Sequence, residues 1–286
     1  MNHQTKSGGP VVLTIAGFDP SGGAGLIADV RTFVRFGVRP TAAITSLTFQ
    51  NSDGYFGAIH ETAESIRAQI LPIVEEHGIA AVKIGMLPTS EIVLEVAQLI
   101  AEAGLPAPVI DPVMRSTSGH ELMSQDAVEA LVAELMPLAR LVTPNIPEAE
   151  SLTGLKITDE NGMRNAAARL RESGARAVLV KGGHLPKERL EGMSGAGGQK
   201  SESTPAVDIL DDDGRVTVLR GEWIDSPNVR GTGCLLSSAI AACLAQGIEL
   251  TESVRLAKEF VADAIRNAPN IQREPVTLEL AEFTGE

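Results

Sequence analysis

Cysteines and basic side chains are both scarce in this chain of 286 residues. The two cysteines, Cys234 and Cys243, lie nine positions apart on one expected helix and therefore on opposite faces. They cannot pair with each other, and they show no metal-ligand spacing. Lysine and arginine number 24 against 37 acidic residues, which gives a net charge of -13 at pH 7. A nucleic acid or an anionic membrane needs a basic patch, so we expect neither as a partner.

Long apolar runs are missing as well. The longest ones, such as residues 239–245, fall far short of the roughly 18 apolar residues that a membrane span needs. Residues 1–10 lack the apolar core of a signal peptide, so we expect a flexible polar tail on a cytoplasmic protein. One α/β domain can reach this chain's length, so we expect a single domain over residues 11–268 and a C-terminal tail over 269–286.

Short β-branched runs alternate along the chain with longer segments that carry apolar residues at helical spacing. The expected strands are 11–16, 41–47, 81–84, 109–111, 141–143 and 177–180. The expected helices are 26–36, 63–76, 90–103, 124–135, 161–173, 233–245 and 251–267. This alternation implies right-handed crossovers and predicts an α/β fold, a three-layer α/β/α sandwich with a mainly parallel central sheet. Residues 207–219 are expected to add a hairpin at one edge.

A glycine-rich loop, GFDPSGGAG at residues 17–25, follows the first expected strand. It fits neither the dinucleotide fingerprint, which must follow its strand directly, nor the Walker loop, which needs Lys and Ser or Thr at residues 23 and 24. We therefore expect it to shape a small-molecule pocket, with Asp19 or Asp29 as a polar contact. Asp29 also fits an exposed acid on the first turn of a helix.

Polar side chains stand at or just after three further strand ends, where a parallel sheet gathers its ligand site. They are Asp111, the pair Asn145 and Glu148, and Lys181 with its two following glycines. The three oxygen-bearing side chains suit a water-rich Mg²⁺ site, and the lysine suits a phosphate. Each residue taken alone also fits a helix cap or a solvated turn.

The sequence GTGC at residues 231–234 leads directly into an apolar helix. A helix start presents unpaired N–H groups, which suit an anion and lower the pKa of a thiol. The same stretch also fits a tight turn with Cys234 packed behind it. Residues 192–204, rich in Gly and Ser, are expected to form a mobile surface loop, or alternatively a lid.

Several motifs in one order now point to a family. They are TIAGFDPSGGAGLIADVRTF, FQN at 49–51, KIGM at 83–86, DPVM at 111–114, TPNIPEAESLTG at 143–154, VKGGHL at 180–185, and GTGC. With these, the chain resembles the hydroxymethylpyrimidine/phosphomethylpyrimidine kinases of the ribokinase-like superfamily over nearly its whole length. The resemblance implies ATP-dependent phosphorylation of a pyrimidine alcohol and then of its monophosphate in thiamine biosynthesis, with Mg²⁺, by a homodimer.

The resemblance also assigns roles to residues. It implies pyrimidine contacts from Asp29, Gln50, Met86 and Val113. It implies an ATP site that comprises Asn145, Lys181, Thr232 and Lys258, with Asp111 and Glu148 on the metal side. The catalytic set it implies is Cys234, Gly231, Thr232, Gly233 and Lys181.

Side-chain chemistry agrees with these roles. Gln50 can donate to and accept from an aminopyrimidine edge, while Met86 and Val113 offer apolar faces to a ring. The amides of 231–234 would form an anion hole, and Cys234, with a lowered thiol pKa, would accept the hydroxyl proton.

Two residues next to GTGC differ from the resembled family, and two alternative functions remain. Arg230 and Leu235 flank GTGC where the resembled family commonly has His and Thr. The arginine adds a permanent charge and the leucine removes a hydroxyl, so we expect a changed handling of phosphate and a changed balance between the two phosphorylations. One alternative is a pyridoxal kinase, since close relatives use the same scaffold and cysteine motif. Another is a non-catalytic relative that senses the pyrimidine, although the presence of Lys181 and Cys234 argues against it.

Overall fold

The computed structural model of the protein describes residues 9–51, 53–116, 119–183, 205–222, 224 and 230–267. The loop predicted at 192–204 and the tail predicted at 269–286 lie outside the described residues, as do residues 1–8 of the predicted N-terminal tail.

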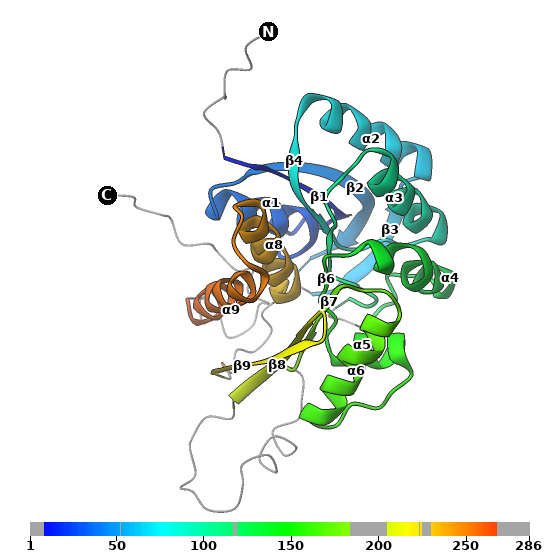
Figure 1. Cartoon of the computed structure of the whole chain (residues 1–286). Coiled ribbons are helices and arrows are strands. Elements are labelled where there is room, and N and C mark those ends of the chain that lie inside the picture. The colour runs from blue at the N-terminus through cyan, green and yellow to red at the C-terminus, as the bar shows by residue number, and fades with distance from the viewer. Residues whose placement is uncertain are drawn as a thin grey trace, which may run out of the picture.

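The described part of the chain is built around one nine-stranded sheet in the order β3-β2-β1-β4-β5-β6-β7-β8-β9 (Figure 1). Its strands are β1 (Val11–Phe18), β2 (Arg39–Gln50), β3 (Tyr55–His60), β4 (Ile79–Ile84), β5 (Val109–Ile110), β6 (Leu141–Val142), β7 (Ala177–Lys181), β8 (Pro205–Asp212) and β9 (Arg215–Glu222). Strands β2, β1, β4, β5, β6 and β7 run parallel, whereas β3 pairs antiparallel with β2, and β8 and β9 form an antiparallel hairpin beside β7. The parallel strands therefore end at one edge of the sheet.

Helices cover both faces of this sheet. Helices α1 (Gly25–Arg35), α8 (Thr232–Ala245) and α9 (Leu250–Arg266) lie on one face. The other face carries α2 (Ala63–Glu76), α3 (Ser90–Glu102), α4 (Gln125–Ala130), the short turns η1 (Leu131–Leu135) and η2 (Met136–Leu138), α5 (Ile146–Thr153) and α6 (Glu160–Glu172). The predicted three-layer α/β/α sandwich is confirmed. None of the helices in the described ranges is both long and apolar enough to span a membrane.

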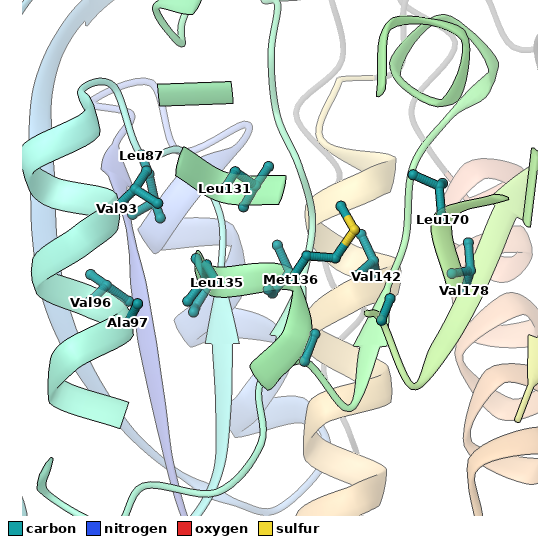
Figure 2. Close-up of a cluster of buried hydrophobic side chains, with 14 of the residues drawn as sticks. Leu87, Val93, Val96, Ala97, Leu131, Leu135, Met136, Val142, Leu170 and Val178 are labelled. Carbon is teal, nitrogen blue, oxygen red and sulfur yellow. The ribbon is translucent and has the colours of Figure 1, made fainter. Parts of the chain in front are cut away.

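Two apolar cores hold the layers together, because alternate residues of a strand point to opposite faces. On β1, Leu13 and Ile15 belong to the core under α2–α6, whereas Val12 belongs to the core under α1, α8 and α9. Figure 2 shows part of the first core, where α3, η1 and α6 meet the sheet through Leu87, Val93, Val96, Ala97, Leu131, Leu135, Met136, Val142, Leu170 and Val178. Each fully buried Leu contributes about 1.5–3 kcal/mol of transfer free energy.

The predicted elements agree with the structure except at three places. The predicted helix 124–135 ends as α4 at Ala130 and continues as a π-turn and a 3-10 turn that contains Pro137. Strand β3 was not predicted, because its glycine and its exposed apolar residues obscure the period of two. Helix α5 was not predicted either; it is eight residues long, with Pro147 in its first turn.

Candidate active site

A cleft of about 1510 Å³ opens at the carboxyl ends of the parallel strands, the expected location in a sheet of this kind. Its walls come from the loops after β1, β2, β4, β5, β6 and β7, from the hairpin β8–β9 and from the helices α8 and α9. Of the predicted site residues, it brings together Gln50, Met86, Asp111, Val113, Asn145, Glu148, Lys181, Gly231, Thr232, Gly233, Cys234 and Lys258. The exception is Asp29.

Two glycine segments meet at the floor of the cleft. Gly231 has φ 77°, and a Cβ there would lie 2.1 Å from the carbonyl oxygen of Gly23. Gly25, with φ 56°, would bring a Cβ to 2.3 Å from the carbonyl oxygen of Gly17. Only glycine fits such contacts, so the loop after β1 and the GTGC loop pack backbone against backbone.

Helix α8 begins at Thr232, and Gly231, in the left-handed conformation, occupies its N-cap. A glycine cap has no side chain to accept from the first amides, so these N–H groups remain available for an anion. A Cβ at Gly233 would lie 3.2 Å from both the Asp111 carboxylate and Lys181 Nζ. The helix N-terminus and this ion pair therefore share one corner of the cleft.

The ion pair itself joins β7 to the end of β5. Lys181 Nζ donates to Asp111 Oδ1 at 2.8 Å, and Thr143 Oγ1 donates to the same oxygen at 3.2 Å. Burial disfavours the charge of Lys181, but the charges of Asp111 and Glu148 outweigh it and raise the pKa of the ammonium above its usual value. Lys181 thus carries a positive charge toward an anion in the cleft.

Asn145 and Glu148 form a reciprocal capping box at the start of α5. The Asn145 amide donates to Glu148 Oε2 at 2.7 Å, and the Glu148 amide donates to Asn145 Oδ1 at 2.9 Å. The helix-cap interpretation is therefore confirmed for Asn145. Burial raises the pKa of Glu148 to about 7; the charge of Lys181 lowers it in part, and the Asp111 carboxylate raises it again.

Two acidic side chains here suit a hard cation. The described residues contain no group of three or more His, Cys, Asp or Glu that could hold a metal ion. Two carboxylates, with the remaining ligands from water and phosphate, are the usual protein share of a Mg²⁺ site, so Asp111 and Glu148 fit this ion.

Cys234 is partly accessible and lies within the same corner. Burial raises the pKa of its thiol to about 11; the charge of Lys83 opposes this rise, and Asp29 and Asp111 add to it. The predicted lowering of this pKa is therefore wrong for the free protein: the sequence shows the helix start but not the enclosing walls or the acidic neighbours. Cys243 is buried in the core, as predicted.

Asp29 does not line the cleft. It is fully buried on α1, where its carboxylate accepts from Lys83 Nζ at 2.8 and 2.9 Å, from Thr14 Oγ1 at 2.6 Å and from Ser238 Oγ at 2.7 Å. This finding corrects both the direct pyrimidine contact and the exposed-acid alternative, because three donor groups already make four hydrogen bonds to the carboxylate, and the residue is fully buried.

Lys83 is a site residue that the sequence analysis did not single out. It lines the cleft from β4, is fully buried, and influences the thiol of Cys234. Burial disfavours its charge, yet the Asp29 carboxylate outweighs this and holds the pKa of Lys83 above its usual range. The available signal was a lysine inside the otherwise apolar strand Ile79–Ile84.

The cleft also has side chains that suit a flat apolar ring, and we call this group of residues the ring-binding end. Met86, Val113 and Tyr55 line it together with Gln50. Arg230 also lines it, and its guanidinium donates to Gln50 Oε1 at 3.0 Å.

The glycine-rich loop contributes at two points. A Cβ at Gly17 would lie 3.1 Å from Met86 Sδ, so the loop packs closely on the wall of the cleft. Asp19, which was predicted together with Asp29 as an alternative polar contact, lines the cleft, and its Oδ1 accepts from the backbone and hydroxyl of Ser21.

Lys258 reaches the cleft from α9. Its ammonium pairs with Asp208 Oδ2, and Asp208 Oδ1 accepts from the Gly182 amide at 2.8 Å. This links α9, β8 and the end of β7 at the wall of the cleft.

The sequence comparisons decide the family. The model of the phosphomethylpyrimidine kinase family matches residues 19–279. The chain belongs to this family. A hydroxymethylpyrimidine/phosphomethylpyrimidine kinase of Streptomyces coelicolor is 40% identical over 256 residues, which cover 90% of this chain and 88% of that protein.

Solved structures of two kinds of kinase share the fold. A phosphomethylpyrimidine kinase from Clostridium difficile 630 has 39% identity and a TM-score of 0.74, with 90% of this chain and 99% of that chain covered. An ADP complex of Bacillus subtilis pyridoxal kinase has 35% identity and a TM-score of 0.80, with 94% and 97% covered. The ribokinase-like fold of this chain is therefore shared by a phosphomethylpyrimidine kinase and by a pyridoxal kinase.

Proposed function

We propose that the protein transfers the γ-phosphoryl group of ATP to 4-amino-5-hydroxymethyl-2-methylpyrimidine, and then a second one to the resulting monophosphate, in thiamine biosynthesis. One observation carries this proposal. One cleft is lined both by the ring-binding end, with Gln50 and Met86, and by Lys181 and the first residues of α8, which we call the anion-binding end. Cys234 belongs to the anion-binding end.

Each end has a defined part in the transfer. The amides at Gly231, Thr232, Gly233 and Cys234 and the ammonium of Lys181 stabilise negative charge on the transferring phosphoryl group. The bond from the substrate oxygen to phosphorus forms while the bond from phosphorus to the bridging oxygen of ATP breaks. The hydroxyl proton passes to the sulfur of Cys234, which must first be a thiolate. Lys83 favours that form, and burial opposes it.

ATP and Mg²⁺ are part of this proposal. Asp111 and Glu148 would hold the metal ion, which neutralises phosphate charge when it is bound. Lys258 and Thr232 would contact the nucleotide. Asn145 would act mainly by capping α5, which fixes Glu148 in place.

A pyridoxal kinase is the second candidate. The TM-score of 0.80 to a pyridoxal kinase supports this alternative, because a hydroxymethylpyridine fits the same kind of ring-binding end. A non-catalytic pyrimidine sensor is the third candidate function, although the ion pair of Lys181 with Asp111 favours phosphoryl transfer.

The proposal extends to the location, the domain range and the oligomeric state of the protein. We infer a cytoplasmic protein whose residues 11–268 form one domain, with a second copy of the chain as its partner. In support, Phe49 on β2 and Ile59 on the edge strand β3 are exposed apolar side chains.

A coupled ADP-release assay tests the function. The full-length protein, with ATP and Mg²⁺, should phosphorylate the pyrimidine alcohol and its monophosphate, with a lower kcat/KM for pyridoxal. Folded protein that turns over neither pyrimidine contradicts the proposal. Faster turnover of pyridoxal supports the second candidate, and pyrimidine binding without ADP release supports the sensor.

A further inference from the structure

Arg230 connects two parts of the chain that are 180 positions apart in sequence. It directly precedes Gly231 at the start of the GTGC loop, and its guanidinium reaches the end of β2. There it donates to Gln50 Oε1 at 3.0 Å and to the backbone oxygen of Asn51. Both Arg230 and Gln50 line the cleft, so this contact lies at the ring-binding end.

The contact determines which way the Gln50 amide faces. A guanidinium has five N–H donors and no acceptor, so the amide atom opposite Arg230 must be the oxygen. Among the described residues, none accepts a hydrogen bond from Gln50 Nε2, which leaves the NH₂ group as the free part of the amide.

A free NH₂ group selects ligands by their chemistry. It pairs with an acceptor, such as an aromatic ring nitrogen, and it does not pair with an exocyclic amino group, which is itself a donor. The neighbouring positive charge polarises the amide and strengthens its N–H donors. The Nε2 group of Gln50 is thus turned toward the ligand as a donor. Its Oε1 already accepts from Arg230, so a second hydrogen bond from the amino group adds to this oxygen but is not needed to satisfy it.

We propose that Arg230 is a positioning residue that fixes Gln50 as a hydrogen-bond donor, so that the protein recognises its substrate through an acceptor nitrogen of the ring. This inference rests on the proposed function, because it takes the pyrimidine alcohol as the ligand at this end of the cleft.

Ligand analogues test the inference on the unmodified protein. Three probes are compared with the parent pyrimidine alcohol: one without the exocyclic amino group, and two in which one or the other ring nitrogen is replaced by C–H. Calorimetry without ATP measures each dissociation constant. We expect one C–H analogue to bind about tenfold to a hundredfold more weakly, because it leaves a donor unpaired. Removal of the amino group should change binding by less than about threefold.

The substitution Arg230→Met tests the positioning role. The amide is then free to turn, so binding of the parent should weaken by roughly threefold to tenfold, and the extra loss with the C–H analogue should shrink. KM for the pyrimidine should rise more than kcat falls, and KM for ATP should stay unchanged. Arg230→Lys, which keeps a donor-only side chain, should restore much of the preference. Arg67→Met, which removes two ion pairs between α2 and α3 outside the cleft, is the matched control.

Several results would overturn the inference. The amino-free analogue could lose as much affinity as the C–H analogue, or Arg230→Met could keep the full preference for the ring nitrogen. The analogue series on the unmodified protein decides the donor assignment even if Arg230→Met does not fold. A parent compound that neither binds nor is phosphorylated contradicts the proposed function itself, whereas normal turnover without a ring-nitrogen preference contradicts only the role of Arg230.

Discussion

Cys234 meets different chemical demands in the two proposed reactions. The pyrimidine alcohol carries a hydroxyl proton that must leave as the new bond to phosphorus forms, so a base is useful. The monophosphate is largely a dianion near pH 7, since the second pKa of a phosphate monoester is about 6. Its attacking oxygen has no proton to lose. A cysteine that acts as a base should therefore matter for the first reaction more than for the second.

We expect Cys234→Ala to lower kcat for the pyrimidine alcohol by about 10² to 10⁴, the usual contribution of a positioned base. The loss for the monophosphate should be much smaller, and some activity should survive because the amides of α8 and Lys181 remain. Steady-state kinetics on both substrates measure this. Equal losses on the two substrates would argue against proton transfer, and near-normal kcat with a lower melting temperature would indicate a packing role.

The protonation state of Cys234 can be measured directly. Because only the thiolate is alkylated, and burial raises the thiol pKa to about 11, labelling by iodoacetamide should be slow near neutral pH. The rate should rise about tenfold per pH unit and continue to rise above pH 9, where an ordinary thiol with a pKa of about 8.5 levels off. The variant Cys243→Ala leaves one thiol to follow. A plateau below pH 8 would contradict the raised pKa.

At the scale of the elements, a buried ion pair joins β4 to α1. Lys83 and Asp29 are both fully buried, and Thr14 on β1 and Ser238 on α8 also donate to the carboxylate. The network thus holds together the four elements that surround the GTGC loop. A charge left alone at this depth is costly, because neither water nor an opposite charge compensates it.

Lys83→Met should therefore lower the free energy of unfolding by about 3–5 kcal/mol, because it leaves the Asp29 carboxylate without its counter-charge. The double variant Lys83→Met/Asp29→Asn removes both charges, and Thr14 and Ser238 can still donate to the new amide oxygen. It should be clearly more stable than the single variant. Urea unfolding of the three proteins at pH 7 gives the comparison. A double variant less stable than the single one would show that the pair does not act as a unit.

At the scale of the whole molecule, the sheet has an exposed edge at β3. Phe49 is 48% exposed, Phe56 68% and Ile59 60%. An edge strand with unpaired backbone groups and apolar side chains is a surface that another chain can cover. A second copy of the protein is the occupant we propose.

Ile59→Lys should weaken the proposed dimer, because a charge in an apolar interface loses its hydration. Val34→Lys is the matched control: Val34 is 63% exposed on α1, a helix that packs on a face of the sheet and is not part of the edge strand. Sedimentation velocity at micromolar concentration should show a dimer for the unmodified protein and the control, and a monomer for Ile59→Lys. A monomeric unmodified protein, or equal dissociation of both variants, would contradict this interface.

Much of the fold could be predicted because it depends on local order in the sequence. The helix 63–76 was predicted with the bounds of α2, and the six parallel strands were placed within a few residues, since each carries its own apolar period. Strand β3 and helix α5 escaped prediction. The first depends on pairing with β2, and the second is short and depends on its cap at Asn145.

The candidate site also has features that the sequence predicts and features that only the folded structure shows. Glycine positions, strand-end acids and the GTGC helix start are properties of short stretches, so the sequence alone predicted many of the residues that gather at the cleft, although it missed Lys83 and wrongly included Asp29. Only the tertiary structure decided the state of those residues. Asp29 meets a lysine 54 positions away, and Gln50 meets an arginine 180 positions away. Burial and charge act through space, so the pKa of Cys234, the burial of Asp29 and the orientation of Gln50 follow only once the chain has folded.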